Sequence, residues 1–364
     1  MKILHIIDSL GLGGAQTVVK GIFENQKNNK NIFLYALRKR EINIKIDHSN
    51  VKIFNSSKKY SLAPIKELRD LIKKENIEVL HCTLFRAQIF GYILKKFYFP
   101  NVKLIIHEQG QIFQNEWYYN RFMNLAQRRV DLYLAVSEAT KIKLIDNAYV
   151  EDFKIKNLPN FVDLIQYSSK KRTLWRNRQR KKYHFKDNDF VFGFAGRFIQ
   201  RKGWKEFIEA ASETSKQQKK MFFLIAGDGP DKNKLIEMIK LSEATDNIKY
   251  MGYVKNMLEF YSLIDCFVLP SYWEGLSLAQ LEVMAMGIPL ITSNGLGLNE
   301  VPSENVDALF CEPKDAGNLA RKMIHIYSNT TLRSKLSRNA QKKVKDYSLK
   351  AYISKLNNIY SNEI

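Results

Sequence analysis

Short apolar runs alternate with longer helical patterns along all 364 residues of the chain. Strand-sized runs occupy residues 2–7, 32–37, 78–82, 102–107 and 131–136, and a second series occupies 190–195, 221–226, 248–251, 264–269, 288–292 and 307–311. Between these runs, apolar residues step by three and four positions, as Ala15, Val18, Val19 and Ile22 do, which is the spacing of one helix face. Strands and helices that alternate in this way predict parallel sheets covered by helices, the α/β fold class.

The alternation breaks once, between residues 159 and 189. Within this stretch, residues 170–186 carry nine lysines and arginines, one tryptophan and no acidic residue before position 187. We therefore place a domain boundary near residue 165 and predict two doubly wound α/β domains, residues 1–165 and 166–345.

Composition narrows the class of protein. Hydrophobic residues make up 45% and charged residues 26% of the chain, as in an ordinary soluble globular protein. The three cysteines, Cys82, Cys266 and Cys311, are too sparse for a disulfide framework or a paired metal site, so a reducing cytoplasm is expected. We identify neither a secretory signal nor a membrane span. The net charge of +21 predicts a negatively charged partner: nucleic acid, an anionic membrane surface or a phosphorylated substrate.

A glycine loop, Gly11-Leu12-Gly13-Gly14, follows the first apolar run and precedes a helix. Such a loop presents backbone N–H groups to an anion or a polar ligand. The dinucleotide fingerprint G-x-G-x-x-G fails at Gln16, and Leu37, Arg38 and Lys39 stand where a ribose-binding acid would be needed. Two interpretations remain: a ligand-facing loop of another kind, and a turn that only needs glycine geometry.

A basic loop follows the run at 190–195 and ends at Gly203. Arg197 offers a planar guanidinium for phosphate oxygens and Lys202 a compact charge, so the two could hold a diphosphate at a strand end. A solvated basic loop is the alternative.

Two glutamates flank the next predicted helix start. Ser277 and Gln280 fit a capping box, so a helix should begin near Ser277, with Glu274 in the loop before it and Glu282 about one and a half turns inside. The helix N-terminus favours an anion, and carboxylates accept hydrogen bonds from the vicinal hydroxyls of sugars and riboses. The alternative is that both acids simply favour a helix N-terminus.

Taken in order, these segments resemble the retaining glycosyltransferases of family four, which have the GT-B fold. The family signature, a glutamate followed after seven residues by another, corresponds to Glu274 and Glu282, with Pro270-Ser271 before it and Met284-Ala285-Met286-Gly287-Ile288-Pro289 after it. Further similarity lies in Gly13-Gly14-Ala15, Val136-Ser137-Glu138, Pro159-Asn160-Phe161-Val162-Asp163, Gly196-Arg197, Lys202-Gly203 and Ala226-Gly227-Asp228-Gly229-Pro230.

The resemblance implies two Rossmann-like domains facing each other across a cleft, with a nucleotide-sugar donor bound mostly by the C-terminal domain. The last helix, residues 346–364, should pack back on the N-terminal, acceptor-side domain.

The resemblance also implies roles for individual residues. Arg197 and Lys202 correspond to the diphosphate clamp, and Glu282 to the ribose ligand. Glu274, with the backbone of Gly275, Leu276 and Ser277, corresponds to the contact with the donor sugar and phosphate. Gly13 and Gly14 would approach the donor from the N-terminal domain.

His107 corresponds to a family histidine near the donor sugar. On position alone His81 is its rival, since both stand at strand ends, and a structural role is the alternative for either. The following residue, Glu108, could share the polar role.

The function that the resemblance implies is the transfer, with retention, of a hexose or N-acetylhexosamine from a nucleotide-sugar, with UDP as the expected nucleotide, to a saccharide acceptor. The setting would be bacterial surface glycan assembly: lipopolysaccharide, capsule or O-antigen. No cofactor or metal is expected if cations clamp the diphosphate, and we interpret Asp187-Asn188-Asp189 as a turn. A GT-B sugar-nucleotide epimerase is one alternative. A basic nucleic-acid-binding protein is the other, but no binding motif supports it, so nucleic acid is not expected as a partner.

Two segments are candidates for contact with a membrane. Residues 170–186 could attract anionic headgroups, and residues 89–99 combine aromatic and basic side chains. A solvated helix and a core helix are the respective alternatives. Our hypothesis is a cytoplasmic enzyme, peripheral on the inner membrane face, with a lipid-linked acceptor.

Overall fold

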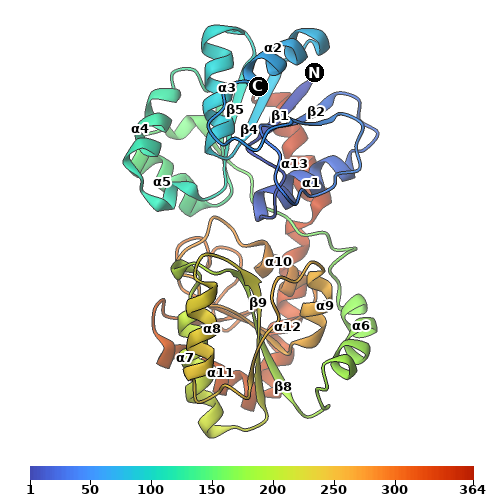
Figure 1. Ribbon diagram of the computed structural model, residues 1–364, viewed down its shortest axis with the longest axis vertical. Coiled ribbons are helices and arrows are strands. Elements are labelled where there is room, and N and C mark those ends of the chain that lie inside the picture. The colour runs from blue at the N-terminus through green and yellow to red at the C-terminus, as the bar shows by residue number, and fades with distance from the viewer. The chain divides into compact units, whose positions relative to one another are not determined.

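The computed structural model describes residues 1–364 and divides into two compact units. The first unit comprises residues 1–161 and 349–364, and the second comprises residues 162–348 (Figure 1). Within the first unit, the C-terminal helix packs against the N-terminal helix. Each unit is built on its own parallel sheet.

The first unit contains a seven-stranded sheet in the order β3-β2-β1-β4-β5-β6-β7. Its strands are β1 (Ile3–Ile7), β2 (Ile32–Ala36), β3 (Val51–Ile53), β4 (Val79–Thr83), β5 (Lys103–Glu108), β6 (Leu132–Ala135) and β7 (Ile155–Asn157). Its helices are α1 (Gly14–Asn25), α2 (Pro64–Glu75), α3 (Phe85–Phe97), α4 (Trp117–Ala126), α5 (Glu138–Ala148) and α13 (Leu349–Asn362), with short 3₁₀ turns η1 (Gln111–Gln114) and η2 (Asp152–Lys154).

The two faces of this sheet differ in polarity. Alternate residues of β1, β4 and β5 pack into an apolar core with α2 and α3; they include Leu4, Leu80 and Ile106. Because successive strand side chains point to opposite faces, His5 of β1 lies on the other face, where it contacts Phe23 of α1 and Tyr360 of α13. That face is therefore apolar only in part.

The second unit contains a six-stranded sheet in the order β10-β9-β8-β11-β12-β13. Its strands are β8 (Phe190–Arg197), β9 (Met221–Asp228), β10 (Ile248–Tyr250), β11 (Cys266–Leu269), β12 (Leu290–Ser293) and β13 (Leu309–Cys311). Its helices are α6 (Ser169–Lys182), α7 (Trp204–Gln217), α8 (Lys232–Leu241), α9 (Met257–Leu263), α10 (Leu278–Ala285), α11 (Ala316–Ser328) and α12 (Thr330–Lys343), with 3₁₀ turns η3 (Gln200–Lys202) and η4 (Val344–Tyr347).

The predicted class and all eleven predicted strands are confirmed, and every strand pair is parallel. Two strands were not predicted, β3 (Val51–Ile53) and β7 (Ile155–Asn157). Each has three residues and lies at an edge of the first sheet. A run that short carries little hydrophobic period, although β10 and β13 are equally short and were predicted.

The strand order of the second sheet brings two distant loops together. β8 lies between β9 and β11. The connection after β8 leads to one side of the sheet and the connection after β11 leads to the other. The carboxyl ends of these two strands therefore flank the crevice where such sheets bind ligands. The loop after β8 is the basic loop, and the loop after β11 carries Glu274.

Most of the basic segment 170–186 belongs to α6, which is docked rather than simply solvated. Arg172, Arg176 and Arg180 project from one face and donate to the carbonyl oxygens of residues 262–264 at the end of α9. Arg176 and Arg180 also form ion pairs with Asp265. Because a helix C-terminus is the negative end of its dipole, three cations stabilise this junction. The solvated-helix interpretation is therefore wrong for this face.

Residues 89–99 belong mainly to α3, and the core-helix interpretation is confirmed for most of them. Phe90, Gly91 and Leu94 are buried, and Lys95, itself buried, forms an ion pair with the partly buried Asp131. Only the end of the segment, from Lys96 to Tyr98, keeps large exposed side chains, with Phe97 64% exposed. No helix in the chain combines the length and the apolar character needed to cross a bilayer.

The α6 junction generates a stability prediction. Asp265→Ala should leave the partly buried charges of Arg176 and Arg180 without their carboxylate, at a cost of about 3 kcal/mol in the free energy of unfolding of the second unit. Lys181→Ala, on the exposed side of α6, should change it by about 0.5 kcal/mol or less. Urea unfolding followed by tryptophan fluorescence measures both; equal effects would contradict the prediction.

Candidate functional site

The basic loop and the glutamate loop of the second unit are in direct contact. The backbone N–H of Tyr272 donates to the carbonyl of Arg201 over 2.7 Å. Gly203 has a φ of 70°, and a Cβ atom there would lie 2.1 Å from the carbonyl oxygen of Pro270. The contact therefore needs glycine at position 203, both for its left-handed backbone and for the close approach.

Glu274 is buried between two cations of the basic loop. Its carboxylate forms an ion pair with Lys202, and Arg201 Nη1 lies 3.4 Å from its other oxygen. The Arg201 guanidinium also stacks 4.0 Å from the ring centre of Trp273. Burial opposes ionisation of Glu274, but Lys202 and then Arg201 outweigh it, so the pKa lies below its usual value. Two cations thus share one carboxylate, which leaves the group net positive.

Arg201 is a residue that sequence reasoning missed. It stands inside the basic loop, next to Lys202, but no spacing rule distinguishes it from a solvated arginine. Arg197, by contrast, lies at the end of β8 with an exposed side chain and no ion pair or hydrogen bond. The structure thus keeps one free cation at the strand edge and two that are held in place.

Helix α10 begins at Leu278, as predicted, but not by the predicted capping box. The Ser277 side chain makes no capping hydrogen bond. Gln280 is buried and donates instead to the carbonyl of Leu298 over 2.8 Å, so its side chain holds the loop at residues 296–298. The first turn contains no acidic residue, so no side chain of that turn neutralises the positive end of the helix dipole. A ligand can therefore interact with this end of the helix, beside the backbone of Gly275, Leu276 and Ser277.

Glu282 lies within α10 beside two tyrosines. Tyr261 donates to its carboxylate over 2.7 Å, and Tyr167 forms a second hydrogen bond. Burial raises the pKa of Glu282 to about 7, although both hydroxyls lower it. The carboxylate of Glu274 thus lies beside cations that lower its pKa, whereas burial dominates at Glu282 and raises its pKa. Tyr167 and Tyr261 were also missed, because they come from distant parts of the chain and no motif contains them.

The glycine loop of the first unit does not need glycine for its backbone angles. Gly11, Gly13 and Gly14 are absent from the residues with left-handed φ, and Gly13 is extended, with a φ of 168°. The turn-geometry interpretation is therefore wrong. Gly13 and Gly14 are exposed at the start of α1, whose first turn has no acidic residue and no side-chain cap. This leaves a helix N-terminus accessible to a ligand.

His107 and His81 belong to one buried hydrogen-bond chain rather than being rivals. His107 Nδ1 lies 3.1 Å from His81 Nε2, and His107 Nε2 lies 3.0 Å from the Gln109 amide nitrogen. Burial lowers the pKa of His107 to about 3, so it is neutral at neutral pH. His81 in turn contacts Tyr360 of α13, a partner that lies too far along the chain for sequence reasoning to find.

Glu108 does not share the polar role of His107. Its side chain points to the opposite face of β5, where it accepts hydrogen bonds from the N–H groups of Gly110 and Ile112 and from the hydroxyl of Tyr119. Burial raises its pKa despite these bonds. Glu108 therefore shapes the loop that follows β5.

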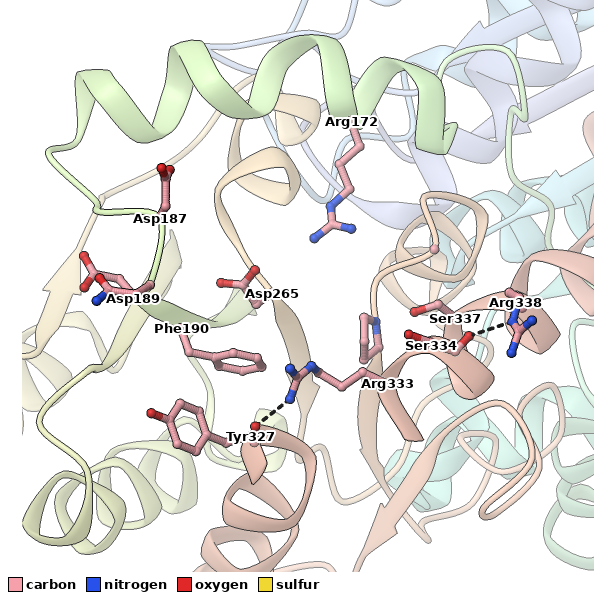
Figure 2. Close-up of a pocket in the computed structure, with 13 residues that line it drawn as sticks. Arg172, Asp187, Asp189, Phe190, Asp265, Tyr327, Arg333, Ser334, Ser337 and Arg338 are labelled. Carbon is pink, nitrogen blue, oxygen red and sulfur yellow. Dashed lines mark hydrogen bonds between the residues drawn. The ribbon is translucent and has the colours of Figure 1, made fainter. Parts of the chain in front are cut away.

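A separate cavity of about 860 Å³ lies at the amino ends of the second sheet (Figure 2). Phe190 at the start of β8 and Asp265 before β11 line it, and Arg172 of α6 points into it. It is at the opposite ends of the strands from Glu274, so it is not part of the candidate site. Asp187-Asn188-Asp189 also line it, and Asp189 closes the predicted turn by accepting from the N–H of Lys186.

Comparison with known proteins places these features in a family context. The model described as Glycosyltransferase Family 4 matches residues 13–166, and the model described as Glycosyl transferases group 1 matches residues 176–343. The UDP-Gal:alpha-D-GlcNAc-diphosphoundecaprenol alpha-1,3-galactosyltransferase of Escherichia coli is 26% identical over 384 residues, which cover 99% of this chain and 96% of that protein. The Escherichia coli O-antigen biosynthesis glycosyltransferase WclY is 22% identical over 357 residues, 93% of this chain and 96% of its own length.

Among solved structures, HepE of Anabaena in complex with UDP-glucose superposes with a TM-score of 0.87 at 19% identity, over 99% of each chain. This likeness confirms the GT-B fold.

The environment of Glu282 generates a prediction. Its carboxyl should titrate near pH 7, and Tyr261→Phe should raise the pKa further, because the lost hydroxyl stabilises the ionised form. Tyr272→Phe is the matched control, since that hydroxyl donates to Glu206 instead. A ¹³C NMR titration of glutamate carboxyl groups measures all three proteins. Titration near the usual 4.5, or a lower value in Tyr261→Phe, would contradict the assignment.

Proposed function

The chain belongs to the retaining glycosyltransferases of family four, and from that premise we propose its substrates. It transfers a hexose or N-acetylhexosamine from a UDP-sugar to a saccharide acceptor in the assembly of a bacterial surface glycan. The observation that carries the donor assignment is the group formed by Glu274, Lys202 and Arg201 at the carboxyl edge of the second sheet.

This group is suited to a diphosphate. Glu274 holds Lys202 and Arg201 in place before any ligand arrives, and Arg197 is unpaired at the same edge. Phosphate oxygens bound there would meet three cations and the positive end of α10, against one carboxylate. A metal ion is not required for that neutralisation.

Glu282 is the proposed ligand of the ribose hydroxyls. Tyr261 and Tyr167 orient its carboxylate, which in its ionised form accepts hydrogen bonds only. Glu274, with the backbone of Gly275, Leu276 and Ser277, is proposed to contact the donor sugar and its phosphate. In the first unit, Gly13 and Gly14 are proposed to approach the donor, and His107 to hydrogen-bond a sugar hydroxyl.

The chemistry proposed for these residues is charge stabilisation. Departure of the nucleoside diphosphate concentrates negative charge on its oxygens, and preorganised cations and helix N–H groups stabilise that charge most in the transition state. Arg197, Lys202 and the start of α10 would supply this stabilisation on the leaving-group side.

The names of the relatives support the finer assignment. The Escherichia coli relative that aligns over 99% of this chain is named for UDP-Gal and for an acceptor linked to diphosphoundecaprenol, and HepE was solved with UDP-glucose. We propose the same classes here: a UDP-sugar donor and a lipid-linked saccharide acceptor.

Donor binding generates a prediction with matched controls. Glu282→Ala should abolish the thermal stabilisation by UDP-sugars, and Lys202→Ala should lose about 1.5–3 kcal/mol of binding free energy, because a hydrogen bond to a charged group is lost. Lys205→Ala and Glu209→Ala, an exposed pair on α7, should bind as the unchanged protein does. Thermal shifts across a panel of nucleotide-sugars test this; unaltered shifts in both site variants would refute the site.

We further propose that a lipid-linked acceptor is reached from the cytoplasmic face of the membrane, with α6 attracted to anionic headgroups. Of the nine cations of residues 170–186, three face inward, and six remain outside: Lys170, Lys171, Arg178, Lys181 and Lys182 of α6, and Lys186 after it. The exposed Leu174 lies among them. Each cation near an anionic surface contributes about 1 kcal/mol.

Flotation with lipid vesicles tests this contact. The protein should float with vesicles that contain anionic lipid, in a salt-sensitive manner. Replacement of Lys170, Arg178 and Lys181 by serine should reduce flotation severalfold. The control replaces Lys205, Lys216 and Lys234, three exposed lysines of α7 and α8, and removes the same charge. Equal losses in the two triple variants would show that only net charge matters and would reject α6 as the contact.

A further inference from the structure

One carboxylate at the carboxyl edge of the first sheet holds two arginines. Asp8 directly follows β1, and Arg38, which follows β2, donates to both of its oxygens, with Nε 3.0 Å from Oδ2. Arg86, in the first turn of α3 after β4, donates to Oδ1 over 3.3 Å. The three side chains are 12% to 16% exposed. Two cations thus share one largely buried acid, and the group carries a net positive charge.

The fold leaves part of each guanidinium unused. Neither Arg38 nor Arg86 forms an ion pair with a second acid. Arg86 also donates to the carbonyl of Ser61 over 2.8 Å and lies over the ring of Phe90. The Nη1 group of Arg38 and the Nε group of Arg86 make no hydrogen bond, and neither atom is sealed from solvent. Accessible donors with an excess positive charge suit an anion that has several oxygens.

This group lies where the chain reverses its direction through the first sheet. β1 lies between β2 and β4, and the chain leads from β1 to one side and from β4 to the other. The helices after these strands pack on opposite faces, α1 beside His5 and α3 in the apolar core. Ligands of open parallel sheets bind at the carboxyl ends of such strands. In the second unit Glu274 holds Lys202 and Arg201 at the corresponding place.

Further positive charge surrounds this group. The side chain of Arg40 lies against the glycine loop, since a Cβ atom on Gly11 would be 3.3 Å from Arg40 Cγ. The first turns of α1 and α3 contain no acid and no side-chain cap, so both helix dipoles add positive charge at this edge. Residues 38–41 and 56–61 have one exposed acid, Glu41, against these exposed cations: Lys39, Arg40, Lys58 and Lys59.

We propose that Arg38 and Arg86 bind a phosphate of the acceptor, within the diphosphate that joins the saccharide to its lipid carrier. The inference rests on the proposed function, in which the donor diphosphate binds Arg197, Lys202 and the start of α10. The cations of the first unit are then available to the second substrate that carries phosphate. Asp8 is a positioning residue, because it holds Arg38 in one orientation before the ligand arrives and so reduces the entropy lost on binding.

The proposed contact makes the diphosphate part of acceptor recognition. An acceptor that lacks phosphate leaves the excess charge of Arg38 and Arg86 unmatched, whereas a diphosphate supplies several oxygens to their free N–H groups. The first unit therefore selects saccharides on a lipid diphosphate over free saccharides and over neutral glycolipids.

Farnesyl diphosphate is a soluble probe for this site, and farnesol is the same chain without phosphate. Calorimetry measures the binding of each to the whole protein, with the second unit saturated by UDP. Arg86→Gln should weaken farnesyl diphosphate binding about tenfold or more, because a hydrogen bond between charged groups is lost. It should leave farnesol binding and the separately measured Kd for UDP unchanged. Arg38→Lys keeps the charge but loses the planar fork, and should weaken farnesyl diphosphate binding severalfold.

A matched control is Arg128→Gln, which removes one exposed charge from the same unit and should bind all three ligands as the unaltered protein does. An equal loss in this control would reduce the effect to net charge and overturn the proposal. Farnesyl diphosphate binding that is absent from the unaltered protein, or unchanged in Arg86→Gln and Arg38→Lys, would also overturn it. A Kd for UDP that weakens as much as that for farnesyl diphosphate, or more, would assign the cations to the donor instead.

Sugar transfer distinguishes this site from the proposed function. The acceptor probe is N-acetylglucosamine linked through diphosphate to farnesol, tested with a panel of UDP-sugars. Arg86→Gln should raise the KM for this acceptor about tenfold or more with little change in kcat. A protein that binds farnesyl diphosphate through Arg86 but transfers no sugar would support the site and reject the proposed function. Transfer with an unchanged KM in Arg86→Gln would keep the function and reject the site.

Discussion

The carboxylate of Glu274 is buried, and a buried carboxylate needs cations close to it, because its loss of hydration is otherwise uncompensated. Lys202 and Arg201 supply them, and they stand 72 and 73 positions before Glu274 in the sequence. The requirement therefore ties the ends of β8 and β11 together. Gly203 is fitted against Pro270, and Gly297, with a φ of 74°, lies so close to the Glu274 carbonyl that a Cβ atom would be 2.1 Å from it. The backbone around the site follows from the ion pair at its centre.

Glu274 and Glu282, the two glutamates of the family signature, differ in their chemistry although they stand only eight positions apart. Glu274 has cations beside it and a lowered pKa, whereas Glu282 has only neutral hydroxyls and a pKa raised to about 7. Environments that separate the pKa values of two like groups give them different roles. The first remains a charged anchor, and the second is close enough to neutrality to respond to a ligand.

The sequence predicts the fold well because the hydrophobic pattern that marks a strand lies within the strand itself. Eleven apolar runs could be located without knowing their neighbours, including the three-residue edge strands β10 and β13, whereas the equally short β3 and β7 were missed. The site divides in the same way. Positions at strand ends, such as Arg197 and Glu274, are visible in sequence. The order of strands, the pairing of Arg201 and the tyrosines around Glu282 depend on three-dimensional proximity, and Ser277 with Gln280 shows that a correct helix start can rest on an incorrect capping contact.

The return of the chain to its first unit has a consequence for biosynthesis. The second unit is continuous in sequence, from Val162 to Ser348, whereas the first unit needs both Met1–Phe161 and Leu349–Ile364. Synthesis from the N-terminus therefore completes the second unit while His5 and His81 still lack the hydroxyl of Tyr360. Until α13 emerges from the ribosome, the half-polar face of the first sheet lacks one of the helices that cover it, and α1 lacks its partner helix. The part of the protein that is made first is the part that matures last.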